Sequence, residues 1–262
     1  MDSLFLFIYS LTPVHAGIGR QIDEYVDIPV QRDEFDIPVI WSSSIRGSLG
    51  NNFPNLKKLL GIRDNKSFSE SEISVLDARL FLIPARTLYG IWIYVTSPHL
   101  LTYYSIYNEI LNKNSPITIN PIPLTTNDKT IIFENDKAYI NEILFDKVKV
   151  EESLKNLFNL LPEELIKKDL PKTSVFVTDD SVVRDVINRS LIIQYRVKLK
   201  ENEKSIDEGP WTEEFIPMFT IFVSGIICKS NCEAVKETIN GKSIIIGGKE
   251  SLGKSLVKLY VK

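Results

Sequence analysis

Cysteine and histidine are scarce in this chain, with two of each among 262 residues. Cys228 and Cys232 are too few for a disulfide framework, and by themselves they cannot fill a four-ligand zinc site. We therefore expect both thiols to be reduced and without a role in the chemistry, in the reducing setting of the cytoplasm. His15 and His99 alone likewise do not suffice for a metal cage.

Long hydrophobic runs are absent as well. The longest nearly apolar run covers residues 215–228 and contains Pro217, Ser224 and Gly225. It is shorter than the ~20 residues that a membrane-spanning helix needs. Residues 1–3 are acidic where a secretory signal is basic, so we expect neither export nor a membrane partner.

The chain also lacks an excess of basic residues, because 31 Lys and Arg face 34 Asp and Glu, a formal net charge of −3. A free-standing nucleic-acid binder usually has a basic domain. Contact with a polyanion would therefore need a local basic groove or a larger assembly. What is present is a globular composition, 44% hydrophobic and 25% charged, with the length of one elaborated domain or two small ones.

The apolar pattern indicates an α+β fold. It predicts strands over residues 4–11, 74–83, 89–96, 191–200, 218–228, 243–246 and 256–261. Helices are expected to begin at the serines 42–44, at Ser97-Pro98, near residue 153, at Asp179 or Asp180 and near residue 231. The order strand–helix–strand–strand–helix–strand suggests a ferredoxin-like core with an antiparallel sheet.

Two long segments interrupt this core. Residues 12–39 combine prolines, glycines and many charges, which predicts a long loop of the kind that is often functional. Residues 114–190 are read as an insertion. The polar stretch 201–209 is read as the tip of a long hairpin over about 191–213. We expect a single domain that carries this insertion and this hairpin.

Residues 247–255 form a glycine-rich loop between two predicted strands. Glycines let a backbone approach a phosphate closely, and Lys249 and Lys254 add positive charge there. From Gly248 the loop matches the phosphate-binding pattern G-x-x-x-x-G-K-[ST], but a strand follows instead of the helix that this motif needs. Taken alone, the loop is therefore best read as a glycine hairpin turn.

Two polar groups near the start of the chain each admit two interpretations. Ser43, Ser44 and Arg46 stand at a predicted helix start, where they either hold an anion or form a plain cap and a solvated face. Asp27 lies in the acidic long loop, where a carboxylate either serves a divalent cation or a proton transfer, or is simply solvated.

Two further candidates are also ambiguous. His15, at the mouth of the long loop, is placed where it could face a ligand. Glu213-Glu214, at the base of the predicted hairpin, either binds a metal or occupies two strand faces, with one glutamate pointing out and the other packed near Arg196 or a lysine.

Taken in order, the motifs resemble a known family. They read LTPVHAGIG at 11–19, VDIPVQR at 26–32, PVI at 38–40, SSIRG at 43–47, LDARL at 76–80, PART at 84–87, VTSP at 95–98, WTEEFIP at 211–217 and the terminal glycine-rich loop. The set spans nearly the whole chain. It resembles the RAMP proteins, and more specifically the repeated backbone subunit of the type III-B CRISPR effector, the Cmr complex.

The resemblance implies an RNA-recognition-like palm over about 1–113 and 214–262, with the hairpin over about 191–213 as a protruding thumb. It implies that copies of the chain stack head to tail along a CRISPR RNA, beside other subunits of the Cmr complex. Each thumb is expected to displace one nucleotide pair of the guide–target duplex at regular intervals.

The resemblance also implies roles for single residues. The carboxylate that matches Asp27 is expected to be required for cutting target RNA at the displaced positions, with a divalent metal such as Mg or Mn present, either by orienting the 2′-OH or by holding the metal. Guide phosphates are expected at a set of residues that contains His15, Ser43, Ser44, Arg46, Gly248, Lys249, Gly253 and Lys254. Thumb positions are expected at Arg196, Trp211 and Glu213.

Two alternatives remain open at this point. The chain is a non-catalytic RNA-binding scaffold of the same kind of complex, or it is a stand-alone ribonuclease that processes the guide. The absence of an evident histidine-based acid–base set argues against the second of these.

Overall fold

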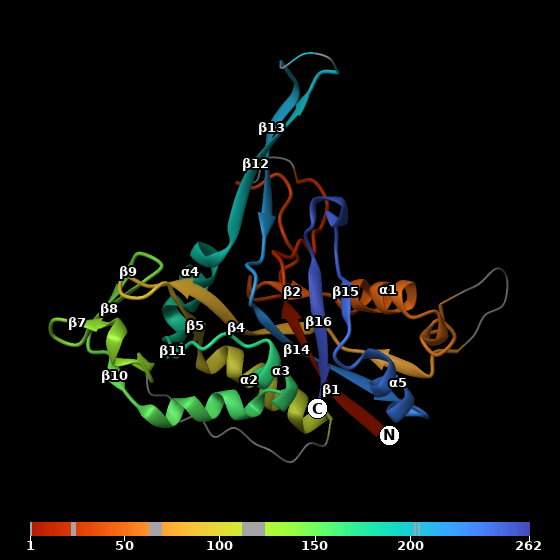
Figure 1. The fold of residues 1–262 in the computed structure, drawn as a ribbon, viewed down its shortest axis with the longest axis horizontal. Helices are drawn as coiled ribbons and strands as arrows, with labels where there is room; N and C mark the ends of the chain where they lie inside the picture. Colours follow the sequence, from red (N-terminus) through yellow and green to blue (C-terminus); the bar gives the residue numbers. More distant parts are fainter. Residues whose placement is uncertain (1, 22–24, 63–69, 112–123, 202, 204) are drawn as a thin grey trace.

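The computed structural model describes residues 2–21, 25–62, 70–111, 124–201, 203 and 205–262 (Figure 1). Its centre is a large, mostly antiparallel sheet with strand order β10-β6-β11-β5-β4-β14-β1-β16-β15, to which β2 adds beside β4 and β3 beside β14. These strands are β1 (Asp2–Ser10), β2 (Val39–Ile40), β3 (Ile73–Val75), β4 (Ala78–Arg86), β5 (Trp92–Thr96), β6 (Thr125–Thr126), β10 (Lys149–Val150), β11 (Val175–Val177), β14 (Ile221–Cys228), β15 (Ser243–Ile245) and β16 (Leu256–Val261).

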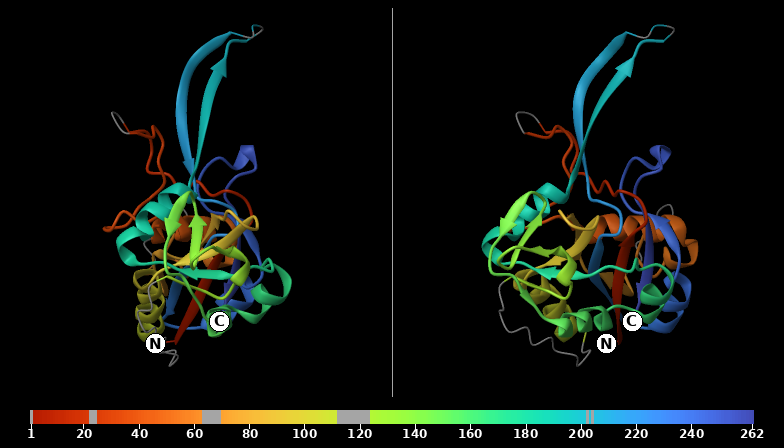
Figure 2. Two further views of the ribbon diagram at one scale, coloured as in Figure 1. Left: turned by 90° about the vertical axis from the view of Figure 1, so that its left-hand side faces the viewer. Right: turned by 60° about the vertical axis from the view of Figure 1, so that its left-hand side comes forward.

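Helices cover both faces of this sheet (Figures 1 and 2). They are α1 (Ser42–Asn52), α2 (Pro98–Ile110), α3 (Glu163–Lys168), α4 (Asp180–Ser190) and α5 (Cys232–Ile239), with 3₁₀ turns η1 (Pro54–Leu56), η2 (Lys129–Ile131), η3 (Glu152–Leu160) and η4 (Glu250–Leu252). A small sheet of β7 (Ile132–Phe133), β8 (Lys137–Ile140) and β9 (Ile143–Phe145) lies in the insertion.

The central strand β1 explains why two helical layers are needed. Its residues from Leu4 to Ser10 are all buried. Side chains alternate across a strand, so Leu4, Leu6 and Ile8 pack into one hydrophobic cluster with α1, α4 and α5. Phe5, Phe7 and Tyr9 enter the other cluster, which includes side chains of α2 and α3. The predicted α+β class with a ferredoxin-like palm is confirmed.

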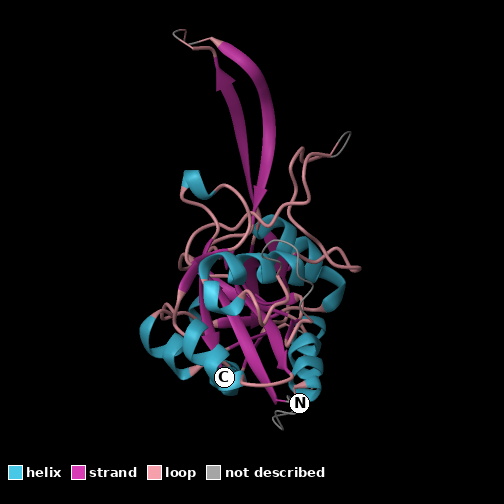
Figure 3. Ribbon diagram, turned by 90° about the vertical axis from the view of Figure 1, so that its right-hand side faces the viewer, coloured by secondary structure: helices cyan, strands magenta, loops and turns pink. Residues whose placement is uncertain are grey.

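The hairpin stands out from this body. It consists of β12 (Ile192–Leu199) and β13 (Ile206–Phe215), paired in antiparallel register from Ile192↔Phe215 to Leu199↔Ile206. Figures 2 and 3 show it extending far beyond the sheets and helices, so that only its base contacts the body. The tip is shorter than the predicted 201–209, because β13 begins at Ile206.

Several local expectations are corrected. The N-cap of α1 is Trp41 rather than a serine, and the Ser42 amide instead donates to Asp77 Oδ1 at 2.7 Å. The predicted strand 74–83 divides into β3 and β4, and the helix expected near residue 153 is the 3₁₀ segment η3. The glycine-rich loop is followed by β16, which confirms that it is not a nucleotide-binding P-loop. Within the described part of the chain, no helix is both long and apolar enough to cross a membrane.

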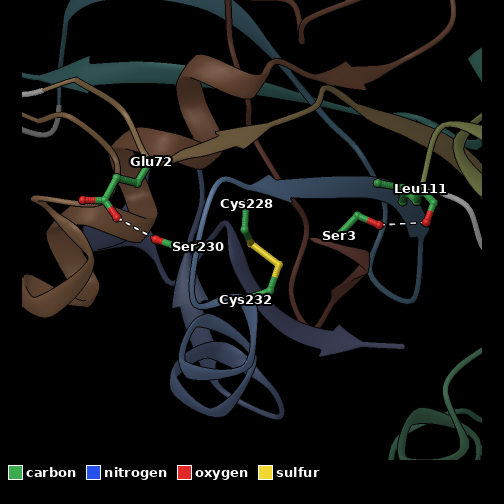
Figure 4. The surroundings of a disulfide bond; sticks show 6 residues. All are labelled: Ser3, Glu72, Leu111, Cys228, Ser230 and Cys232. Carbon is green, nitrogen blue, oxygen red and sulfur yellow. Dashed lines mark hydrogen bonds between the residues drawn. A yellow bond between two sulfur atoms is a disulfide. The ribbon is translucent and has the colours of Figure 1, made fainter. Parts of the chain in front are cut away.

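The prediction that both cysteines are reduced is wrong. Cys228 ends β14 and Cys232 begins α5, and their sulfurs form a disulfide bond (Figure 4). The turn between them, with Asn231 at a φ of +55°, brings their Cα atoms to 5.6 Å, within the range that a disulfide spans. The number of cysteines excludes a framework of several disulfides, but it does not exclude one disulfide between two cysteines that are close in the sequence.

We expect reduction of this disulfide to lower the stability of the protein. A cross-link that closes so short a loop restricts the unfolded chain by about 2 kcal/mol. The melting temperature should therefore fall by about 4–8 °C when a reductant is added. Thermal unfolding with and without dithiothreitol measures this, and a Cys228→Ala, Cys232→Ala variant should show no response. If dithiothreitol leaves the melting temperature of the native protein unchanged, the disulfide does not stabilise the fold.

Candidate nucleic-acid interface

Three segments meet at the base of the hairpin: the long loop 12–39, the glycine-rich loop and β13 (Figures 1 and 3). Strand alternation gives β13 two faces. Thr212 and Glu214 point to one face, where they meet the long loop. Trp211 and Glu213 point to the other, where Trp211 donates to Glu213 and Glu213 meets Lys249 of the glycine-rich loop.

Asp27 is fixed to β13 by reciprocal hydrogen bonds with Thr212. The Thr212 amide and hydroxyl donate to Asp27 Oδ2 at 2.7 and 2.8 Å, and the Asp27 amide donates to Thr212 Oγ1 at 2.9 Å. Next to them, Ile28 pairs with β13 through Ile28 N to Thr212 O at 3.1 Å and Glu214 N to Ile28 O at 3.0 Å. The loop therefore adds to the hairpin like a short extra strand, which aims the carboxylate.

These contacts also set the charge of Asp27. The Thr212 amide, then the Thr212 hydroxyl, and more weakly the positive charge of Arg20, lower the pKa of the Asp27 carboxyl below its ordinary value. The group is therefore an anion at neutral pH. A carboxylate has about four lone-pair sites, so the two bonds from Thr212 leave capacity for a further donor or a cation.

A Thr212→Val variant tests this local cause. It removes the hydroxyl donor but keeps the shape of the side chain and the amide donor. We expect the Asp27 pKa to rise part of the way toward its ordinary value, since only one of the two Thr212 donors is lost. Carbon-13 NMR titration of labelled aspartate measures the shift in both proteins. An equal Asp27 pKa in the two would show that the hydroxyl does not set the charge.

Glu214 holds the same loop through a buried ion pair. Its Oε1 accepts from Arg32 Nη2 at 2.8 Å, and its Oε2 accepts from the Val30 amide at 3.0 Å. Arg32 Nη1 also donates to Asn188 Oδ1 of α4 at 2.9 Å. The part of the loop that follows Asp27 is thus bonded to the hairpin and to α4.

On the opposite face of β13, Glu213 is paired through one of its two carboxylate oxygens, while its Oε2 is buried without a hydrogen-bond partner. Glu213 is 1% exposed, and Lys249 Nζ and Trp211 Nε1 donate to its Oε1 at 2.5 and 2.9 Å. Burial alone would raise the pKa of Glu213, but the bonds from Lys249 and Trp211, with the charge of Arg196, outweigh it and lower the pKa. Glu213 and Glu214 therefore do not form a metal pair: they occupy opposite strand faces, and the lysine near Glu213 is Lys249. The expectation that one of them points outward is wrong, because Glu214 is also buried, with 4% of its surface exposed.

His15 is buried at this junction, with 4% of its surface exposed. Its Nδ1 lies 2.7 Å from Glu214 O, its amide donates to Ser255 Oγ at 3.0 Å, and its carbonyl accepts from the Gly248 amide at 2.9 Å. The ring lies beside Phe215, with centroids 5.4 Å apart. In this arrangement His15 joins the long loop, β13 and the glycine-rich loop, and its expected contact with RNA stays a prediction.

The glycine-rich loop has room only for glycine at its entry. Gly247 has a φ of +109°, and a Cβ there would collide with the His15 carbonyl oxygen. Gly248 and Gly253 are exposed. Lys254 Nζ lies 5.1 Å from the centre of the Phe215 ring. The loop thus presents exposed backbone and a lysine on the face of β13 that does not carry Asp27.

The start of α1 forms the third part of the interface. Ser43 is exposed, and Ser44 Oγ accepts a hydrogen bond from Gln31 Nε2 at 3.0 Å. Arg46 is exposed, but its Nε and Nη2 donate to the carbonyls of Leu60 and Gly61 at 2.9 and 3.1 Å. Two of its five N–H donors are therefore used by the protein, and three stay available for a phosphate.

Sequence reasoning missed the two residues that connect these parts. Thr212 holds Asp27, and the buried Gln31 links the long loop to α1, since its Oε1 also accepts from the Trp41 amide at 2.8 Å. The Gln31 amide and carbonyl bond to Ala16 O and Val39 N. Gln31 lies inside the motif VDIPVQR, so its place in the chain was visible although its partners were not.

Asp27 is the residue of this interface that suits the expected divalent cation as a ligand. Within the described ranges, no group of three or more His, Cys, Asp and Glu side chains is arranged to hold an ion. Asp27 offers an ionised carboxylate with spare lone pairs. Mg²⁺ commonly keeps several waters and takes one or two carboxylates together with substrate phosphates. The donor set fits a hydrated Mg²⁺ or Mn²⁺ shared with RNA, and not an all-protein cage.

Comparisons with known proteins agree with this architecture. The family model of the RAMP superfamily matches residues 7–258. The chain is 31% identical to "CRISPR system CMR subunit Cmr4" of Saccharolobus solfataricus, over 97% of this chain and 94% of that protein. It is also 31% identical to "CRISPR system Cmr endoribonuclease Cmr4" of Pyrococcus furiosus, over 100% of this chain and 96% of that protein.

Solved structures give the same result. A chain of the type III-B Cmr-beta complex bound to cognate target RNA superposes with a TM-score of 0.80 and 27% identity, over 100% of this chain and 97% of that one. The crystal structure of oligomeric Cmr4 from Pyrococcus furiosus gives 0.72 and 26%, over 100% and 98%. The protein belongs to the RAMP superfamily and, within it, to the Cmr4 backbone subunits of type III-B Cmr complexes.

Proposed function

We propose that this chain binds CRISPR RNA as a repeated subunit of a cytoplasmic Cmr complex and cuts complementary target RNA at regular intervals. The observation that carries the proposal is the ionised carboxylate of Asp27, fixed by Thr212 at the base of a hairpin that projects from the body. The Pyrococcus furiosus relative is named an endoribonuclease, and the Cmr-beta structure contains cognate target RNA.

The hairpin and the carboxylate act together in this proposal. The thumb enters the guide–target duplex and displaces one nucleotide pair. A displaced nucleotide leaves A-form geometry, so its 2′-OH can align in-line with the adjacent phosphate, an alignment that a constrained duplex resists. Asp27 accepts the hydrogen of that hydroxyl and orients it. Because Thr212 holds the carboxylate on the hairpin itself, the displacing element and the reacting group keep a fixed relation.

The guide is held on other surfaces. The ammonium of Lys254, the Ser43 hydroxyl and the unused N–H groups of Arg46 offer donors to its phosphates. Gly248 and Gly253 let the RNA backbone approach closely, although their own amides already donate to His15 O and Glu250 O. Of these surfaces, the glycine-rich loop meets the face of β13 opposite to the one that Asp27 contacts, which keeps this part of the guide away from the cutting group. Lys249 can contact a guide phosphate only if its ion pair with Glu213 breaks.

A divalent cation completes the site in this proposal. Asp27 would hold it together with an RNA phosphate, and when bound it supplies positive charge that stabilises the transition state of phosphodiester cleavage. Chelation by EDTA is therefore expected to stop cutting while duplex binding persists.

Assembly accounts for the acidic composition. A chain with a net charge of −3 gains a continuous RNA groove only when copies stack along the guide. The oligomeric crystal form of the Pyrococcus furiosus relative supports such self-association. The other Cmr subunits are further expected partners.

Product mapping tests the proposal. A complex reconstituted with this chain, a guide and end-labelled complementary RNA should yield cuts at regular intervals in the presence of Mg²⁺ or Mn²⁺. A target that stays bound and intact would instead identify the chain as a non-catalytic scaffold. A non-complementary RNA of equal length is the control, and it should remain uncut.

A further inference from the structure

A cavity of about 290 Å³ opens between the long loop, the first residues of β12 and α4. Val26 and Pro29, which flank Asp27 in the chain, line it together with Glu214. Thr212 and Glu214 lie on the same face of β13, two residues apart, a separation of about 7 Å along a strand. The carboxylate that Thr212 holds is therefore a neighbour of this cavity.

The lining combines an aromatic rim with a polar floor. Tyr25 borders the cavity with 87% of its surface exposed, and Ile193 adds apolar surface from the base of the hairpin. Such a side chain offers a free face on which a base can stack. The cavity is at the small end of ligand pockets, so it suits one planar group rather than a stretch of chain.

The polar groups of the floor are already paired with one another. Arg32 donates to Glu214 and to Asn188, and the second oxygen of Glu214 accepts from the Val30 amide. A base in this cavity therefore gains stacking and shape contacts, but no polar side chain of the lining is reserved for hydrogen bonds with the edge of the base. Such a pocket accepts all four bases, which is what a nuclease directed by an arbitrary guide requires.

We propose that this cavity receives the base of the displaced target nucleotide, with Tyr25 as its stacking platform. The inference rests on the proposed function and adds a base-binding subsite to it. Seating the base beside Asp27 fixes the ribose of the same nucleotide near the carboxylate. Tyr25 acts in this way as a positioning residue.

Fluorescence of 2-aminopurine tests the subsite without relying on cleavage. The probe replaces the displaced base of the target in a complex built with Asp27→Asn. We expect its emission to be quenched by stacking, and Tyr25→Ala to restore the emission several-fold. Tyr89→Ala, at an exposed tyrosine on the connection between β4 and β5, is the matched control and should leave the probe quenched. Equal emission with and without Tyr25, or quenching only when the probe is placed in the guide, would overturn the proposal.

Cleavage kinetics supply the second arm. An abasic ribonucleotide at the displaced position keeps the 2′-OH and the phosphate but has no base to stack. We expect it to slow the cut at that position about tenfold in the native complex, and to have no added effect in Tyr25→Ala. Equal slowing in both would overturn the subsite. Quenching through Tyr25 in the Asp27→Asn complex, together with no cutting by the native complex, would keep the subsite but reject the proposed function, so the two failures are distinguishable.

Discussion

Replacing Asp27 with Asn should abolish target cleavage while leaving target binding nearly unchanged. The amide has almost the shape of the carboxylate, but it carries no charge and cannot take a proton from a 2′-OH. Loss of a positioned acid–base group costs about 10²–10⁴-fold in rate. Single-turnover cleavage and filter binding of the same reconstituted complex measure the two quantities separately.

Glu34→Gln is the matched control for this change. Glu34 lies on the same loop, is 58% exposed, and pairs with Arg79 at 3.0 Å, but it neither contacts the Asp27–Thr212 pair nor lines the cavity beside it. Its replacement should leave the cleavage rate within the error of the assay. Full cleavage by the Asp27→Asn complex would remove Asp27 from the mechanism.

Replacing Asp33 with Ala should destabilise the protein far more than replacing its neighbour Glu34. Asp33 has a side chain only 2% exposed, and Arg79 and the Tyr103 hydroxyl donate to its Oδ2 at 2.9 and 2.7 Å. Its Oδ1 accepts from the amides of Phe35 and Ile37. Removing one partner of a buried pair costs about 3–5 kcal/mol, which chemical denaturation measures.

Glu34 supplies the control because it pairs with the same arginine. Its carboxylate lies 3.0 Å from Arg79 Nη1, but its side chain is 58% exposed. Exposed ion pairs contribute about 0–1 kcal/mol, so Glu34→Ala should change the free energy of unfolding little. Similar losses for the two variants would contradict the assignment of Asp33 as the buried anchor of the loop.

The periodic parts of the fold were predictable from the sequence. The apolar run of β1, the serine and proline that open α2, and the glycine-rich turn before β16 are local signals that the structure reproduces. Ser97 does cap α2, accepting from the Leu100 amide. Such signals depend on neighbouring residues in the chain, which the sequence displays directly.

Contacts between distant segments were not predictable in the same way. Thr212 and Asp27 are 185 residues apart, and Glu213 and Lys249 are 36 apart. Nothing in the local pattern distinguishes Gln31 as the link to α1 from a solvated glutamine. The serine cap expected for α1 is absent for the same reason, because Asp77, in the connection between β3 and β4, accepts the hydrogen bond of the Ser42 amide.

Mixed assembly tests most directly whether each copy of this chain cuts its own target position. Complexes are built from native chains and Asp27→Asn chains in known ratios, and the cut at every interval is quantified. Every band should weaken in proportion to the native fraction, with no change in spacing. Bands that keep their full strength whatever the ratio would show that the cutting group belongs to another subunit.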